Sequence, residues 1–210
     1  MARSAYADIV ALTGTIGAGK TTASAIFREL GASVVDADAI VHRLLSEDAA
    51  VIAAIRTHFG ASVVGAAGAL DHASLAKSVF NDPAHRKVLE KIVHPRVAAE
   101  ALKEFSAALA SLSPLVIYDV PLFFEAGLDQ EGYRAVILLV ADDELCIERL
   151  MQRGGLSRGE ALKRLAAQMP IAEKKRRADF IIENQGTIEE LQHKIQQLYV
   201  QLTQLKSCSS

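Results

Sequence analysis

Residues 12–22 read LTGTIGAGKTT and directly follow an apolar run. The stretch fits the pattern G-x-x-x-x-G-K-[ST], with the defining positions filled by Gly14, Gly19, Lys20 and Thr21. Glycines permit backbone conformations that are closed to other residues, so successive N–H groups can turn inward around phosphate oxygens. The stretch therefore predicts a phosphate-binding loop between a buried strand and a helix.

Each part of this loop has a role in holding a triphosphate. The helix that begins at Lys20 points its positive end at the anion. The Lys20 ammonium group reaches the β- and γ-phosphates, and the Thr21 hydroxyl can bind Mg²⁺. We therefore predict ATP and Mg²⁺ as cofactors. The predicted phosphate loop comprises Gly14, Thr15, Ile16, Gly17, Ala18, Gly19, Lys20, Thr21 and Thr22.

Five apolar runs predict strands that are buried on both faces of a sheet. They are rich in β-branched residues and continuous rather than alternating, as in parallel sheets covered by helices. Helix-patterned segments lie between them, so we expect an α/β fold with a five-stranded, mostly parallel sheet and helices on both faces. The predicted strands begin at Ile9, Ser33, Leu115, Ala135 and Ala178.

Two segments interrupt this alternation. Residues 39–113 are too many for one crossover helix and are almost entirely helix-patterned, so they predict a helical insertion that forms a subdomain. Residues 144–175 contain two helical stretches around the sequence GGLS and predict a hinged lid. The nucleotide-binding core is then expected to comprise residues 1–38, 114–143 and 176–206.

The composition excludes several classes of partner. The chain has 210 residues and a formal net charge of −2, which argues against binding to nucleic acid or an anionic membrane. No apolar run reaches membrane-spanning length, and Cys146 and Cys208 lack the spacing of a metal site or disulfide framework. With no signal peptide expected, we predict a cytoplasmic protein. The run KKRR at 174–177 lacks interleaved aromatic residues and is interpreted as a solvated stretch.

Two aspartates follow the second predicted strand, in the sequence SVVDAD. In an extended segment, Asp36 and Asp38 leave the backbone on the same side, at the sheet edge where the phosphate loop lies. A carboxylate there can orient an acceptor hydroxyl and accept its proton, so Asp38 is the predicted base with Asp36 in support. The alternative is that one or both aspartates cap the helix that follows.

Further polar residues follow later strands. Asp119 ends the run LVIYD and either holds Mg²⁺ through water or fixes the turn that follows. Four arginines lie on or next to the predicted lid, where a closing segment would neutralise charge on the transferred phosphoryl group. Arg149 and Arg153 are the leading candidates, although a solvated charge on a helix face is the ordinary role of any single one.

Five motifs, in this order, resemble those of dephospho-CoA kinases: LTGTIGAGKTTASAIFRELGASVVDADAIVHRLL, KIVHPRV, VIYDVPLFFEAGLD, ERLMQRGGLSRGEALKRLAAQM and KKRRADFIIENQGTIEEL. The glycine loop is shared by many NTPases, whereas its pairing with DAD, HP, PLFFE and ADFIIEN is far more specific. The resemblance runs from about Ile9 to Leu198. It implies ATP-dependent phosphorylation of the ribose 3′-hydroxyl of dephospho-CoA, the last step of coenzyme A synthesis, on a nucleoside-monophosphate-kinase-like core.

The resemblance also implies roles for individual residues. Asp38 would be the base, and Arg149 and Arg153 would be lid contacts. Residues near the turn after the last strand would lie beside the adenine: Asn184 and Gly186. The acceptor would be faced by His94, Leu122 and Glu125. Thr15 and Thr21 depart from the usual Gly and Ser of the family, and Thr21 keeps the hydroxyl.

Two other classes of protein share part of this pattern. Kinases of the shikimate or gluconate type have the loop and a DxD sequence but would use a shorter insertion, and the shikimate type would carry a Gly-Gly-Gly motif that is missing from this sequence. A guanine-nucleotide switch would need N-K-x-D after a late strand, and this tetrad is also missing from the sequence.

Overall fold

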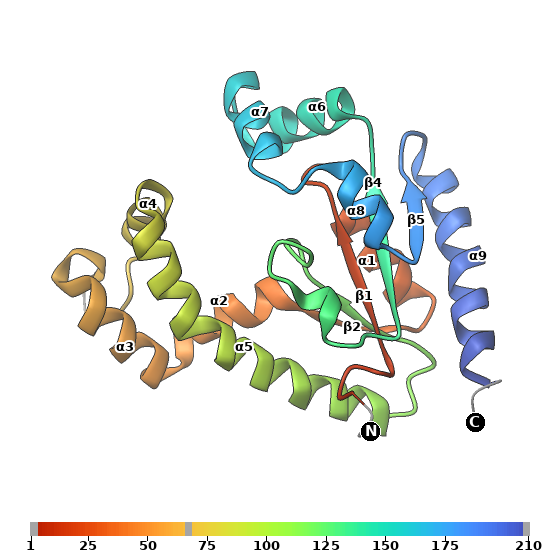
Figure 1. Cartoon of the computed structure of the whole chain (residues 1–210), viewed down its shortest axis with the longest axis horizontal. Coiled ribbons are helices and arrows are strands. Elements are labelled where there is room, and N and C mark those ends of the chain that lie inside the picture. The colour runs from red at the N-terminus through yellow and green to blue at the C-terminus, as the bar shows by residue number, and fades with distance from the viewer. Residues whose placement is uncertain (1–3, 66–68, 208–210) are drawn as a thin grey trace. The chain divides into compact units, whose positions relative to one another are not determined.

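The structure is a computed structural model that describes residues 4–65 and 69–207 (Figure 1). Cys208 lies outside the described residues. The chain forms two compact units, one of residues Ala37–Glu104 and the other of Met1–Asp36 with Phe105–Ser210. In the part of the chain that the structure describes, no helix has the length and apolar character needed to cross a membrane.

The larger unit is built on one sheet of five strands in the order β2-β3-β1-β4-β5. Every pairing between these strands is parallel, which confirms the predicted fold class. Their carboxyl ends therefore meet at one edge of the sheet, where ligands bind in folds of this kind. The strands are β1 (Ile9–Gly14), β2 (Ser33–Asp36), β3 (Val116–Asp119), β4 (Ala135–Val140) and β5 (Phe180–Glu183).

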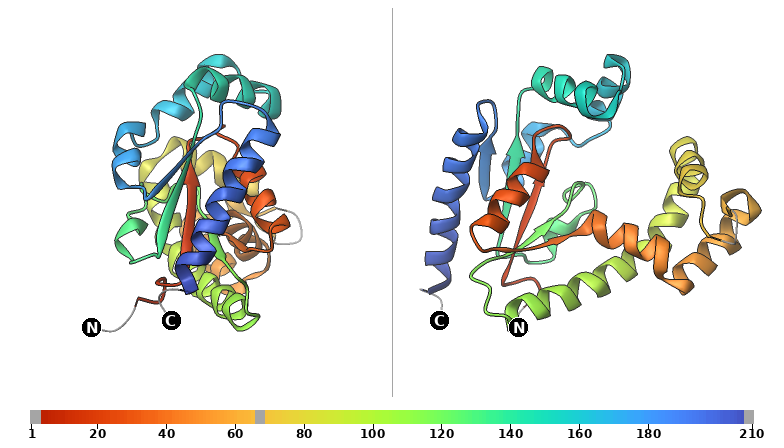
Figure 2. Two further views of the ribbon diagram at one scale, coloured as in Figure 1. Left: turned by 90° about the vertical axis from the view of Figure 1, so that its right-hand side faces the viewer. Right: turned by 180° about the vertical axis from the view of Figure 1, so that it is seen from behind.

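Helices α1 (Lys20–Glu29) and α9 (Ile188–Ser207) cover one face of this sheet (Figure 2). They pack against each other and against the side chains of one sheet face, as Leu12, Phe27 and Ile195 show by their complete burial in one cluster. Full burial of one such side chain contributes about 2 kcal/mol to stability. This layer holds the start of α1 in place.

Aromatic side chains cover part of the opposite face. Phe105, near the end of α5 (Pro83–Ala110), lies edge-on to Tyr118 of β3 with ring centroids 5.1 Å apart. Phe123 makes a similar edge-on contact with Tyr133 at 5.1 Å. Because both faces of β1, β3 and β4 are buried, these strands need apolar residues at consecutive positions. The prediction of burial on both faces is wrong for the edge strand β5, where Ile181 is 43% exposed.

Three helices follow β4 and lead to β5 (Figure 1): α6 (Asp143–Gly154), α7 (Arg158–Ala166) and α8 (Ile171–Arg177). A capping box starts α7. The Ser157 side chain accepts a hydrogen bond from the backbone N–H of Glu160, and the Glu160 side chain accepts one from the backbone N–H of Ser157. The short 3-10 turn Leu128–Gln130 lies between β3 and β4. The connection between α7 and α8 comprises residues 167–170.

The interpretation of KKRR as a solvated run is wrong for two of its residues. The Lys174 side chain is 1% exposed and its Nζ lies 2.7 Å from a carboxylate oxygen of Glu125. Arg177 is half-buried, ion-paired with Asp129 at 2.7 Å, and its guanidinium lies over the Phe124 ring. A helix packed on one side buries residues at helical spacing, so consecutive cations cannot all face the solvent.

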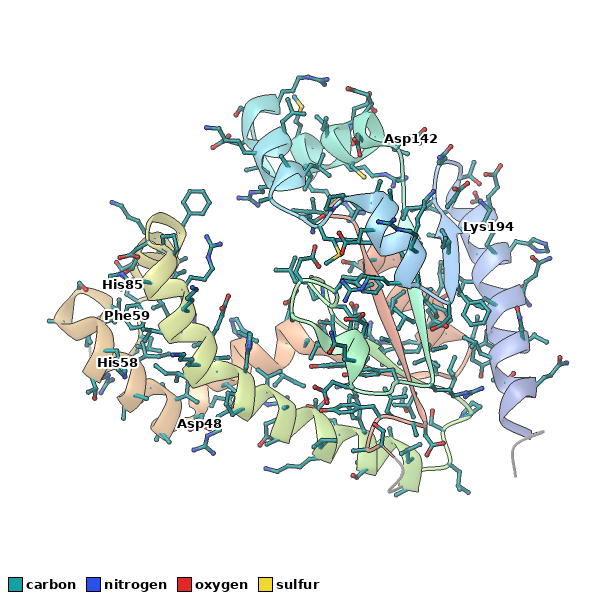
Figure 3. All side chains as sticks on the ribbon, viewed as in Figure 1. Asp48, His58, Phe59, His85, Asp142 and Lys194 are labelled. Atoms are coloured by element: carbon teal, nitrogen blue, oxygen red, sulfur yellow. The ribbon has the colours of Figure 1, made fainter. Side chains whose placement is uncertain are left out.

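The smaller unit is helical. Its elements are α2 (Ala37–Glu47), α3 (Ala49–Phe59), the 3-10 turn Gly60–Val63, α4 (His72–Asn81) and most of α5. Asp48 caps α3, because its carboxylate accepts hydrogen bonds from the N–H groups of Ala50 and Val51 at 2.9 and 3.1 Å. The labelled Phe59 and His85 of Figure 3 bring α3 and α5 together, with ring centroids 5.2 Å apart.

Candidate active site

The glycine loop joins the end of β1 to the start of α1 and needs glycine at three positions. A Cβ atom at Gly14 would lie 2.7 Å from the Leu139 carbonyl oxygen. Gly17 and Gly19 have φ values of 83° and 97°, in the left-handed region. A Cβ atom at Gly17 would lie 2.7 Å from the Cys146 carbonyl oxygen, and one at Gly19 would lie 2.5 Å from Asn184 Nδ2. Any other residue at either position would force the loop away from its neighbours.

The backbone N–H groups of the loop fall into two sets. Three are satisfied within the protein: Thr15 donates to Leu139 O at 3.1 Å, Ala18 donates to Thr15 O at 3.0 Å, and Ile16 donates to Gln168 Oε1 at 3.0 Å. A second set makes no hydrogen bond to any residue in the described ranges: Gly17, Gly19, Lys20, Thr21 and Thr22. These donors surround the positive end of α1, which suits them to bind a phosphate group.

Lys20 and Ser24 hold a buried carboxylate beside the loop. Asp119 is 3% exposed; one of its oxygens is ion-paired with Lys20 Nζ and the other accepts a hydrogen bond from Ser24 Oγ at 2.5 Å. Ser24 was not predicted, although its position four residues after Lys20 places both on one face of α1. Asp36 lies in register with Asp119 on the neighbouring strand, so two carboxylates end adjacent strands here.

These residues fit a magnesium ion that arrives with a nucleotide. Within residues 4–65 and 69–207, no group of three histidine, cysteine, aspartate or glutamate side chains could hold a metal ion. Mg²⁺ usually keeps several waters and takes only one or two protein ligands besides phosphate oxygens. The exposed Thr21 hydroxyl fits a direct ligand, and Asp119, with both oxygens engaged, fits a contact through water.

Arg149 and Asn184 meet the loop from α6 and from the end of β5. Asn184 is buried and its side-chain amide donates to Ala18 O at 2.8 Å. Arg149 Nη1 donates to Gly17 O and to Asn184 O, each at 3.4 Å. The structure therefore brings together Arg149, a predicted lid residue, and Asn184, which the resemblance placed beside the adenine.

A hydrogen bond joins the turn after β5 to the residue that precedes α6. Asp142, labelled in Figure 3, accepts a hydrogen bond from Gln185 Nε2 at 2.8 Å. The predicted residue Gly186 follows on this turn and is exposed, while the labelled Lys194 donates to Glu183 O at 2.6 Å. Arg153 is exposed and has no hydrogen bond or ion pair with another described residue.

The predicted acceptor residues lie in different parts of the chain. Asp38 is on the first turn of α2, and His94 is on α5; both belong to the Ala37–Glu104 unit and both are exposed. The prediction that Asp36 and Asp38 leave an extended segment on the same side is wrong, because β2 ends at Asp36 and the helix begins at Ala37. Leu122 belongs to the larger unit and is 49% exposed. The geometry within each unit leaves these three side chains accessible.

Glu125 has a different environment, because protein groups occupy its carboxylate. The backbone N–H of Met169 donates to Glu125 Oε1 at 3.0 Å, and Lys174 Nζ lies 2.7 Å from the same oxygen. Burial raises the pKa of Glu125, but Lys174 and the Met169 N–H outweigh burial, and the pKa is lowered overall. Sequence reasoning missed Lys174 and Gln168, since neither belongs to a local pattern that predicts its partner.

Cys146 should resist thiol reagents. Its backbone lies against Gly17, its side chain is fully buried, and burial raises the pKa of the thiol to about 11. At pH 8 the thiolate is then on the order of 100-fold scarcer than for an ordinary cysteine. We expect a Cys208→Ser variant, which leaves only Cys146, to be labelled at least about 100-fold more slowly when folded than in denaturant. Equal labelling rates in the folded and denatured protein would contradict the burial of Cys146 against the phosphate loop.

Comparisons with known proteins agree on one family. The family model described as "Dephospho-CoA kinase" matches residues 8–190. The dephospho-CoA kinase of Syntrophotalea carbinolica is 40% identical over 194 residues, 92% of each chain. That of Anaeromyxobacter dehalogenans is 44% identical over 195 residues, again 92% of each chain.

Solved structures agree with this assignment. A crystal structure from Thermus thermophilus has a TM-score of 0.81 and 38% identity, covering 92% of this chain and 97% of that one. Dephospho-CoA kinase from Campylobacter jejuni has a TM-score of 0.71 and 29% identity, covering 95% and 98%. A shikimate kinase from Acinetobacter baumannii, at a TM-score of 0.51 and 22% identity over 92% and 93% of the two chains, shares the fold alone. The phosphate loop, the parallel sheet and these matches together show that the chain belongs to the dephospho-CoA kinase family.

Proposed function

We propose that this protein transfers the γ-phosphoryl group of ATP to the ribose 3′-hydroxyl of dephospho-CoA, giving coenzyme A and ADP. The observation that carries the proposal is the set of backbone N–H groups without protein partners at the start of α1, beside Lys20, in a chain of this family. Such N–H groups at the positive end of a helix suit an anion with up to four charges.

On the nucleotide side, the loop binds the phosphates and Lys20 neutralises charge on the β- and γ-phosphates. Mg²⁺, when bound, neutralises further charge between those phosphates, with Thr21 as its ligand and Asp119 acting through water. The adenine lies beside the turn that carries Asn184 and Gly186. The burial of Asn184 against Ala18 supports this placement, because it fixes that turn relative to the loop.

On the acceptor side, Asp38 orients the 3′-hydroxyl and accepts its proton as the bond to phosphorus forms. Asp38 follows directly from β2, whose carboxyl end lies at the same sheet edge as the loop, which supports the assignment. Asp36 assists, and His94, Leu122 and Glu125 contact the acceptor. The helical insertion 39–113 binds the remainder of dephospho-CoA.

The segment 144–175 acts as a lid that closes over the phosphates. Arg149 and Arg153 then stabilise the charge on the transferred phosphoryl group, and closure excludes water that would otherwise accept it. The contact of Arg149 with Gly17 O supports its role, because the guanidinium already lies against the loop. The protein acts in the cytoplasm, without nucleic acid or membrane partners.

The proposal is tested by measuring ADP release with a panel of alcohols. Dephospho-CoA, shikimate and gluconate are each supplied with ATP and Mg²⁺, the product is identified by mass, and NMR locates the phosphorylated hydroxyl. We expect dephospho-CoA to accelerate ADP release at least about 10³-fold over water, because an oriented acceptor gains the advantage of proximity that water lacks. The other two alcohols should leave the rate near that of water.

Three results would contradict all or part of the proposal. Faster turnover with shikimate or gluconate would assign the protein to another kind of small-molecule kinase. Tight binding of nucleotide with no acceleration by any alcohol would favour a nucleotide-binding switch. A product phosphorylated at a position other than the 3′-hydroxyl would keep the kinase but reject the stated acceptor group.

A further inference from the structure

Gln168 links the α7–α8 connection to the phosphate loop. Its side-chain oxygen accepts a hydrogen bond from the backbone N–H of Ile16 at 3.0 Å, across 152 residues of sequence. Among the satisfied N–H groups of the described loop, that of Ile16 donates to a side chain, the Gln168 amide. Those of Thr15 and Ala18 donate to backbone carbonyls. A single side chain therefore completes the hydrogen bonding of the loop's first half.

The position of Gln168 is itself fixed. Its N–H donates to Leu165 O at 3.1 Å, which closes the last turn of α7. The next residue, Met169, donates to Glu125 Oε1 at 3.0 Å, and Glu125 is held by the buried Lys174 at 2.7 Å. The α7–α8 connection is thus anchored to the segment after β3 while it reaches the loop.

Ile16 directly precedes the first loop residue whose N–H group lacks a partner among the described residues. The N–H groups before it are satisfied, and Gly17, directly after it, is the first residue whose N–H has no partner in the described chain. Gly17 also has a φ of 83°, which its lack of a side chain allows but does not enforce. The direction of the Gly17 N–H therefore depends on how firmly Ile16 is held.

We infer that Gln168 is a positioning residue for the phosphate loop, a role that rests on the proposed function and adds a residue to it. By fixing Ile16, Gln168 keeps the loop in its binding shape before a phosphate arrives. A glycine-rich loop without this bond would have to lose conformational entropy on binding, which weakens affinity. Gln168 does not touch the reacting atoms and acts through Ile16.

The test compares two substitutions at this position. Gln168→Met keeps the length of the side chain but removes the acceptor, and Gln168→Glu keeps an acceptor for the Ile16 N–H. We expect Gln168→Met to weaken ADP binding about five- to tenfold, as loss of one hydrogen bond predicts, and to speed exchange of the Ile16 amide hydrogen by a similar factor. Gln168→Glu should keep the slow exchange. Gln192→Ala, on the exposed face of α9, is the control and should change neither quantity.

Calorimetry measures ADP binding, and NMR measures amide exchange in the protein without nucleotide. Neither measurement depends on the acceptor alcohol, so they separate this inference from the proposed reaction. Unchanged exchange at Ile16 in Gln168→Met would overturn the inference, as would unchanged ADP affinity. Tighter ADP binding by Gln168→Met would also overturn it, because Gln168 would then be a competitor that occupies a donor needed by the phosphate. A wild-type protein that binds ADP but phosphorylates no alcohol would contradict only the proposed function.

Discussion

Replacing Asp38 by Asn should lower kcat with dephospho-CoA by about 10³-fold while ATP binding changes less than about threefold. The amide has nearly the shape of the carboxylate but cannot accept the proton of the acceptor hydroxyl. Asp38 is exposed on the first turn of α2, and Asn is an equally good residue near a helix start. Steady-state kinetics with dephospho-CoA and calorimetry with ATP measure the two quantities separately.

Asp82→Asn is the matched control for this experiment. Asp82 is also an aspartate at a helix start in the Ala37–Glu104 unit, where its carboxylate accepts a hydrogen bond from Ala84 N at 2.7 Å. We expect kcat to stay within about twofold, because Asn keeps the capping oxygen. Near-normal turnover by Asp38→Asn would remove Asp38 from the chemistry. Equal losses of kcat in both variants would show that the loss comes from the changed net charge of the Ala37–Glu104 unit and not from removal of a catalytic base.

Replacing Glu125 by Gln should lower the free energy of unfolding by about 3 kcal/mol at pH 7. The substitution keeps an acceptor for the Met169 N–H but leaves Lys174, whose side chain is 1% exposed, without its anionic partner. For a protein of this size the melting temperature should fall by roughly 6–12 °C, which calorimetry measures directly. A role of Glu125 confined to the acceptor would instead raise KM for dephospho-CoA and leave the melting temperature unchanged.

The pH dependence identifies the carboxylate as the source of this stability. The pKa of Glu125 is lowered in the folded protein, so its contribution is complete above the ordinary glutamate value near 4.3 and is lost as the pH falls through the folded value. The gap between wild type and Glu125→Gln should therefore be constant from about pH 7 to 5.5 and narrow below about pH 4.5. A gap that widens on acidification would contradict this sign.

A neighbouring ion pair provides the control for Glu125. Lys175 lies 3.2 Å from Glu183, but both of these side chains are substantially exposed. Glu183→Gln should cost less than about 1 kcal/mol, because water screens the pair and solvates the remaining lysine. The same change from Glu to Gln should therefore lower the free energy of unfolding strongly where the partner is the buried Lys174, and weakly where it is the exposed Lys175.

The sheet and the phosphate loop could be predicted from sequence because their signals are local. The five continuous apolar runs correspond to the five strands, and the loop pattern fixes Gly14 and Gly19; the structure adds Gly17 as a second left-handed position beside Gly19. Both features follow from the backbone: a strand buried on two faces and a loop in the left-handed region restrict the residues that fit.

The supporting contacts could not be predicted, because each depends on residues that are distant in sequence. Ser24 and Asp119 meet across 95 residues, and Ile16 and Gln168 across 152. In the run KKRR, composition alone favours solvation, and only the packing of α8 places Lys174 inside. Asn184 was found only through the family resemblance, since a lone asparagine after a strand has many ordinary roles.

The order of the strands bears on how enzymes of this kind diverge. β1 carries the phosphate loop between two bonded neighbours, whereas β2, which leads into the Ala37–Glu104 unit, has one neighbour at the margin of the sheet. A marginal strand tolerates changes of length and twist that would break the ladders on both sides of a central one. Changes in the Ala37–Glu104 unit, which follows the edge strand β2, can therefore alter which alcohol is bound. The phosphate loop after the central strand β1 can stay unchanged.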